Sequence, residues 1–246
     1  MCLDESDGYY VKHRDRFDPF IVQIETCLAV RLGEIFAEEE VPVIMREVLE
    51  DYEKLLPRLP YIGDDNPLAF NLVGATYGVC LYGRLEERGL ELREISLINQ
   101  KVLLDWSRQT MTPERVEYMR HVALAPDTVA KGAERSRKRV YAGDWVYECV
   151  LPERNEDFDI GITYTKCGVA DFLEKIGKKR YLPYICLNDY PIYGAMGIFF
   201  KREHTIGNGD DCCDFRFKLN ETGNVLDPIC DPAILLKFRE NDPGDR

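Results

Sequence analysis

Long apolar runs and positive charge are both scarce in this sequence. No run approaches the ~18 consecutive apolar residues of a membrane-spanning helix, and residues 1–10 are polar and acidic, unlike a secretory signal. Lysine and arginine number 32 against 44 aspartates and glutamates, a formal net charge of −12, so the basic stripe that binds a phosphate backbone is missing. These absences predict a cytoplasmic protein without nucleic-acid or membrane partners. They favour a small-molecule substrate and leave a homo-oligomer open.

Cysteine is present, but its spacing lacks a metal-binding signature. The chain has nine cysteines, an odd number that argues against a complete disulfide framework, and cytosolic thiols stay reduced. Three of them, Cys167, Cys186 and Cys213, would form a permitted zinc ligand set with one aspartate or histidine. No Cys-x-x-Cys pair occurs among these three. We therefore predict a site without a metal or another cofactor, and keep a zinc protein as an alternative.

The first half of the chain has the periodicity of helices. Apolar residues recur at three- and four-residue spacing, which predicts a helical region within residues 1–140. Asn66 followed by Pro67 is typical of a helix start, and Gly89 of a helix end. Further helices are expected over residues 92–108, 113–122 and 126–138.

The pattern changes near Gly143 to the period of two that predicts β-strands. Strands are expected within residues 144–153, 157–165, 198–206 and 212–219. A short helix should begin at Cys167 and end near Gly177, and the last two strands should meet in a tight hairpin turn at Gly207-Asn208-Gly209. The predicted class is α+β: the helical region packs on an antiparallel sheet with short helices in residues 141–246, and the two regions form one compact domain.

Alternation along the last strand separates its side chains into two sets. If Phe215 and Phe217 point into the core, Cys213 points in with them. Asp214 and Arg216 then point the other way, together with Cys212. A regular strand therefore cannot direct Cys213 and Asp214 into one pocket unless a bulge re-aims one of them.

Three segments of the second half, "YTKCG", "PYICLND" and "KREHTIGNGDDCCDFRF", resemble the L-2-amino-thiazoline-4-carboxylic acid hydrolase family. The residues that carry the resemblance are Cys167, Cys186, Asp189, Thr205, Gly209, Cys213, Asp214, Phe215, Arg216 and Phe217. Asn188 and Pro191 depart from the expected pattern and put the local helix start in doubt. The ending is also similar to that of vinyl-reductase-like ligand domains, which pack helices against an antiparallel sheet.

The resemblance implies a hydrolase that opens a cyclic amidine at a C–N or C–S bond. Such a reaction needs a nucleophile, a proton donor and a group that holds the substrate carboxylate. A cysteine thiolate, a buried aspartate and an arginine supply these functions. The candidate catalytic residues are Cys167, Cys186, Asp189 and Cys213. The candidate substrate-binding residues are Asp214, Arg216, Thr205 and Tyr164, the last as a phenol donor.

Each role has a structural alternative. Cys167 opens a helix, where a thiolate is stabilised, but it could equally be an inert buried thiol. Asp189 could act as the base for Cys186 or cap the following helix. Asp214 and Arg216 could form an ordinary surface ion pair, and His204 is a further candidate base. At the level of function, the alternatives are a ligand-binding or sensory module without turnover and a zinc protein.

Overall fold

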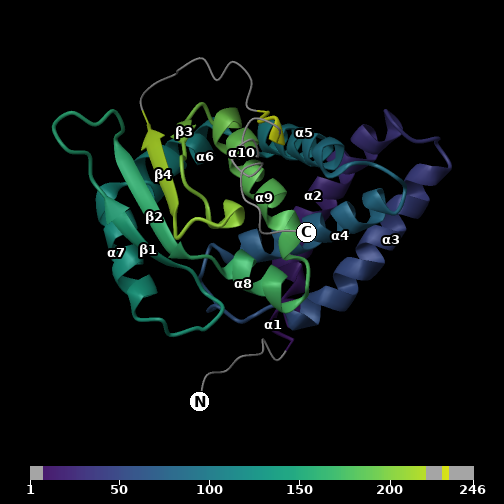
Figure 1. Cartoon of the computed structure of the whole chain (residues 1–246), viewed down its shortest axis with the longest axis horizontal. Helices are drawn as coiled ribbons and strands as arrows, with labels where there is room; N and C mark the ends of the chain where they lie inside the picture. Colours follow the sequence, from purple (N-terminus) through teal and green to yellow (C-terminus); the bar gives the residue numbers. More distant parts are fainter. Residues whose placement is uncertain (1–7, 220–228, 233–246) are drawn as a thin grey trace, which may run out of the picture.

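The computed structural model describes residues 8–219 and 229–232, and the predicted α+β class is confirmed (Figure 1). The first half is helical. Its elements are α1 (Tyr9–Lys12), α2 (Arg14–Gly33), α3 (Glu40–Leu55), the 3-10 turn η1 (Leu56–Arg58), α4 (Ala69–Glu86), α5 (Leu92–Thr110), α6 (Pro113–Tyr118), the π-helical turn η2 (Met119–Ala123) and α7 (Pro126–Arg137). No helix among the described residues is long and apolar enough to cross a bilayer.

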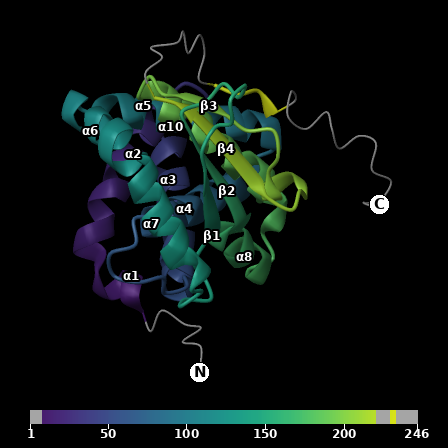
Figure 2. The same ribbon diagram turned by 90° about the vertical axis from the view of Figure 1, so that its left-hand side faces the viewer.

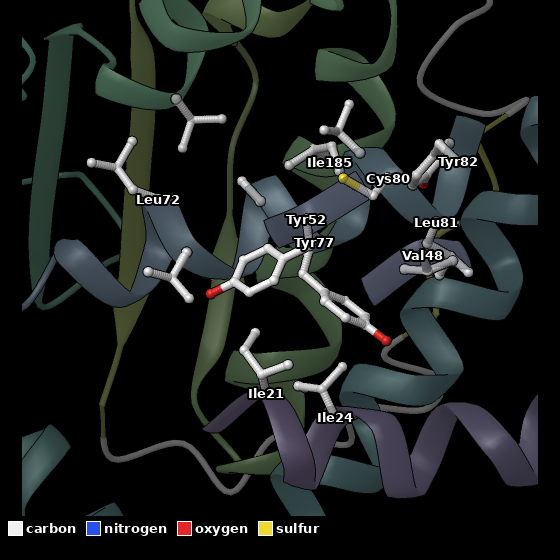
Figure 3. Packing of buried hydrophobic residues seen from close by; sticks show 14 of the residues in the cluster. Ile21, Ile24, Val48, Tyr52, Leu72, Tyr77, Cys80, Leu81, Tyr82 and Ile185 are labelled. Atoms are coloured by element: carbon white, nitrogen blue, oxygen red, sulfur yellow. The ribbon is translucent and has the colours of Figure 1, made fainter. Parts of the chain in front are cut away.

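Helix α4 forms the centre of the helical half. It is buried along most of its length and packs against α2, α3 and α5. Figure 3 shows Tyr77 of α4 and Tyr52 of α3, whose ring centroids lie 5.7 Å apart in an edge-to-face contact. Ile21 and Ile24 of α2 belong to the same apolar cluster. The absence of a polar face on α4 follows from this position, because a helix that is apolar all round is a buried helix.

The start of α4 differs slightly from the prediction. The helix begins at Ala69, whereas Asn66 caps the turn before it: its Oδ1 accepts the backbone N–H of Leu68 at 3.0 Å. The predicted end is correct, since α4 stops at Glu86 and Gly89 adopts a φ of 87°, a conformation that glycine tolerates.

The second half builds one four-stranded antiparallel sheet. The strands are β1 (Val146–Val150), β2 (Ile160–Lys166), β3 (Phe199–Lys201) and β4 (Cys213–Lys218), in the order β1-β2-β4-β3. The register between β2 and β4 pairs Tyr164 with Cys213, Ile162 with Phe215 and Ile160 with Phe217. These pairs form the buried face of the sheet, as the alternation of β4 predicted.

Helices cover the buried face of the sheet, and the other face is polar. Helix α7 lies against β1, as Figure 2 shows. The remaining elements are α8 (Gly168–Lys175), η3 (Lys179–Tyr181), α9 (Leu182–Ile185), η4 (Cys186–Asn188), α10 (Asp189–Ala195) and η5 (Ile206–Asn208). Helix α10 packs between β3 and α5, and so joins the sheet to the helical half.

The tight hairpin predicted between the last two strands is wrong. β3 ends at Lys201, and residues 202–212 form a longer connection that includes η5. Beyond Lys201 the side-chain carboxylate of Asp214 accepts the backbone N–H groups of Glu203 and His204, at 3.0 and 2.6 Å. Asp210 then accepts the backbone N–H of Thr205 at 2.7 Å, and Gly209 closes the turn with a φ of 96°.

The contact between α7 and β1 depends on a glycine. A Cβ at Gly132 would lie 2.2 Å from the Tyr147 hydroxyl oxygen, so Gly132→Ala should lower the free energy of unfolding by about 1–3 kcal/mol. Gly83→Ala is the matched control: among the described residues nothing lies within 4 Å of its Cβ, and it should stabilise the helix by about 0.5–1 kcal/mol. Urea unfolding measures both. Equal changes in the free energy of unfolding for the two variants would show that Tyr147 does not restrict the side chain at position 132.

Candidate active site

A cavity of about 310 Å³ lies between the helical half and the sheet. Helices α2, α4 and α5 form one wall; β2, β4, α10 and the segments around α8 and α9 form the other. Its volume is at the lower end of the range typical of small-molecule sites. The cavity is the space in which the predicted site residues can be located.

Three thiols that are distant in sequence line this cavity. Cys167 is the N-cap residue of α8, directly after β2. Cys186 is the first residue of η4, and Cys213 begins β4 on its buried face. The predicted convergence of these residues around one cavity therefore occurs. Their catalytic roles are a separate question.

Burial keeps two of the thiols protonated. Desolvation raises the pKa of Cys167 to about 12 and that of Cys186 to about 11. The backbone N–H groups of Ala170 and Val169 at the start of α8 lower the pKa of Cys167, but burial outweighs them. The expectation that the helix start makes Cys167 a ready thiolate is thus not met.

These pKa values predict a loss of stability in alkali. The unfolded chain releases the two protons near pH 8.5, whereas the folded chain holds them until about pH 11 for Cys186 and 12 for Cys167. Above pH 9 the unfolded chain binds fewer protons, so the free energy of unfolding falls by up to about 1.4 kcal/mol per pH unit and thiol. The free energy of unfolding, measured with urea between pH 8 and 10.5, should fall less steeply with pH in Cys186→Ala than in the wild-type chain. The exposed-site control Val30→Ala should keep the wild-type slope; an unchanged slope in Cys186→Ala would contradict the raised pKa.

Cys213 differs from the other two thiols in its hydrogen bonds. Its sulfur accepts the backbone N–H of Ile206 at 3.2 Å and lies 3.5 Å from the Thr205 hydroxyl. The Thr205 hydroxyl also hydrogen-bonds to Cys186 and lowers the pKa of that thiol. Thr205, predicted to bind substrate, is buried and in contact with two sulfur atoms.

The buried Arg202 and the half-buried Asp189 form an ion pair in the cavity wall. Arg202 Nη1 lies 2.8 Å from Asp189 Oδ2, and Nη2 donates to the Cys186 carbonyl oxygen at 2.8 Å. Burial raises the pKa of Asp189, and Arg202 lowers it. The alternative role of Asp189 as a helix cap is wrong: it is the first residue of α10 and its carboxylate binds Arg202. Among the described lining residues, Arg202 is the one cation and Asp189 the one anion.

Neutral polar groups also line the cavity. Tyr164 lines the cavity, and burial raises its pKa well above the ordinary value, so its phenol stays a donor. Asn99 of α5 donates to Asn188 of η4 at 2.9 Å. This bond ties the helical half to the segment that carries Cys186. Asn188, which departs from the pattern expected of the family, therefore has a structural role here.

Asp214 and Arg216 do not face the cavity. Asp214 Oδ1 accepts the backbone N–H groups of Glu203 at 3.0 Å and His204 at 2.6 Å. Arg216 donates to the Thr163 hydroxyl at 3.4 Å and to the Phe215 carbonyl at 2.9 Å. These contacts replace the ion pair expected between them. Both lie on the polar face of the sheet, as does the exposed His204, so the structure does not support contact with a molecule in the cavity.

The geometry of possible metal ligands does not favour the zinc alternative. In the described part of the chain, the ligand atoms that lie within 4.8 Å of one another belong to Glu203, His204 and Asp214 on the surface. The three thiols form no such group with Asp189 there. A tetrahedral zinc site needs its four ligands at about 2.0–2.3 Å from one ion.

Arg202 is the main site residue that sequence reasoning missed. The arginine expected to hold a carboxylate was Arg216, one strand further on. The sequence contained a signal for the direction of this side chain. Strand alternation along residues 198–206 places Arg202 on the same face as Phe200. Its guanidinium in fact lies 5.7 Å from the Phe200 ring and 5.2 Å from the Phe215 ring.

Comparison with known proteins identifies a family. A family model described as L-2-amino-thiazoline-4-carboxylic acid hydrolase matches residues 76–217. This range covers more than half of the chain and contains Cys167, Cys186, Asp189, Arg202 and Cys213. No curated protein and no solved structure matches the chain.

Proposed function

The chain belongs to the L-2-amino-thiazoline-4-carboxylic acid hydrolase family, and we propose that it opens a small cyclic amidine that carries a carboxylate. The observation that carries the proposal is the convergence of three thiols and the Asp189–Arg202 pair on one cavity. Nucleophile, acid–base group and charged anchor are the three functions that this reaction needs.

The charges of the cavity suit such a substrate. An amidine is basic and a carboxylate is acidic, so the substrate carries both signs of charge. Asp189 is the group that can bind the amidine, and Arg202 the group that can bind the carboxylate through its remaining N–H donors.

We assign the nucleophile to Cys213, because its sulfur accepts the backbone N–H of Ile206 and lies 3.5 Å from the Thr205 hydroxyl, both at the start of the turn around η5. The sulfur adds to the ring carbon between sulfur and nitrogen. The ring C–S bond breaks, and the thiol proton ends on the released ring sulfur. The carbon is then held on Cys213 as an S-linked isothiourea. Asp189, whose pKa is raised by burial, is the acid–base group.

Water completes the cycle. It adds to the isothiourea carbon, the bond to Cys213 breaks, and the thiol recovers its proton. The product is a carbamoylated amine with a free thiol, and one water molecule is consumed in total. Cys167 and Cys186, whose pKa values are raised by burial, stay neutral and line the same cavity.

The direct test is turnover of L-2-amino-thiazoline-4-carboxylate by the purified full chain. The new free thiol can be titrated, and mass spectrometry should show a product heavier than the substrate by one water. Binding without any product would favour the alternative, a ligand-binding module. If the chain neither binds this compound nor converts it, this substrate is excluded.

A further inference from the structure

The helical wall of the cavity differs in chemistry from the wall that carries the thiols. On the helical side the cavity is lined by Phe20 and Ile24 of α2, Phe70 of α4, and Leu103 and Trp106 of α5. The charged pair and all three thiols lie on the opposite wall. The charged side chains of the cavity therefore lie on one side, and the helical side carries none.

Three rings of the helical side form a continuous surface, which we call the aromatic wall: Phe20, Phe70 and Trp106. Phe20 contacts both others edge-to-face, with centroids 5.2 Å from Trp106 and 5.8 Å from Phe70. All three rings are half-buried although they line an interior cavity. Apolar surface that a cavity leaves uncovered gains free energy when an apolar group of a ligand covers it.

Two glycines of α4 keep this space open. Gly74 and Gly78 lie one turn apart and both line the cavity. A Cβ at Gly74 would lie 3.3 Å from the Phe20 ring, and one at Gly78 would lie 3.2 Å from Ile185 Cδ1. Glycine inside a helix is less favourable than alanine, and at these positions it provides room for the neighbouring side chains and the cavity.

A bare aminothiazoline carboxylate uses only half of this cavity. Its amidine and carboxylate match Asp189 and Arg202, but it has no large apolar group to place against the aromatic wall. We propose that the ligand of this site carries, besides the amidine and carboxylate, an aromatic or branched apolar group that packs on Phe20, Phe70 and Trp106. The inference rests on the hydrolase function proposed above for the identity of the polar end.

The experiment uses the two tryptophans of the chain, Trp106 and Trp145, as reporters, because both line the cavity. Fluorescence titrations compare 2-amino-thiazoline-4-carboxylate with its 5-phenyl derivative on the Cys213→Ser chain, which does not consume the ligand. The phenyl derivative should bind at least tenfold more tightly. In the Cys213→Ser/Trp106→Ala chain, read through Trp145, this preference should fall at least tenfold, and Trp106→Phe should restore most of it.

Surface and activity controls separate this inference from the proposed function. Val30→Ala, at an exposed position of α2, should keep the full preference. Equal affinities, or tighter binding of the unsubstituted compound, would overturn the inference even if the wild-type chain hydrolyses both. A Trp106-dependent preference without hydrolysis of either compound would support the aromatic wall as a ligand site and remove the hydrolase function.

Discussion

Replacing Cys213 by serine should lower kcat for an aminothiazoline carboxylate by at least about a thousandfold. A hydroxyl at this position is a far weaker nucleophile than a thiolate, although it fits the same space. Acid-quenched wild-type enzyme should carry the S-linked adduct on the peptide that contains Cys213, detectable by mass spectrometry. The variant should lack this adduct and keep a wild-type thermal unfolding midpoint within a few degrees.

The neighbouring cysteine provides the matched control. Cys212 directly precedes β4 and, unlike Cys213, does not line the cavity. Cys212→Ser should therefore leave kcat within about twofold. If Cys213→Ser keeps its activity while Cys167→Ser or Cys186→Ser loses it, the nucleophile is one of those thiols and our assignment is wrong.

The second large effect is expected at Arg202. Arg202→Met leaves the Asp189 carboxylate without its partner inside the protein, and should lower the free energy of unfolding at pH 8 by about 3 kcal/mol. Loss of the guanidinium also raises the pKa of Asp189 further, since Arg202 is the group that lowers it. A carboxyl group whose pKa is higher in the folded than in the unfolded chain lowers the free energy of unfolding at high pH. Protonation of the group removes this loss. The deficit of Arg202→Met should therefore shrink as the pH falls from 8 to 5, measured by urea unfolding.

A double variant distinguishes the unpaired charge from lost packing. Asp189→Asn removes the charge but keeps the shape, so Arg202→Met/Asp189→Asn should recover most of the lost stability. If the double variant is as unstable as Arg202→Met, the loss comes from the contacts of the guanidinium with the Phe200 and Phe215 rings. A pH-independent deficit would lead to the same conclusion.

Strand β4 shows how local sequence pattern predicts which face of a sheet a side chain occupies. Strand alternation correctly placed Cys213, Phe215 and Phe217 on the buried face, because side chains of a strand alternate with a period of two. The same rule correctly placed Asp214 and Arg216 on the other face. Assigning those two residues to substrate binding relied on the family resemblance, and here the strand pattern was the better guide.

The connection between β3 and β4 shows where local pattern is insufficient. Gly207-Asn208-Gly209 suits a tight hairpin, yet the turn forms within a longer loop. Beyond Lys201 the backbone N–H groups of Glu203 and His204 bind the side chain of Asp214 on the neighbouring strand β4. The turn residues alone do not reveal a contact between a side chain and the backbone of another strand.

Periodicity, turn residues and charge balance in the amino-acid sequence were sufficient to determine a helical half, an antiparallel sheet and the orientation of each residue in β4. These properties depend on neighbours a few positions away. Only the tertiary structure decided that burial keeps Cys167 and Cys186 protonated, that Arg202 rather than Arg216 is the cation of the cavity, and that the opposite wall is aromatic. Desolvation and ion pairing depend on which segments, distant in sequence, pack together and exclude water. This is a property of the tertiary structure.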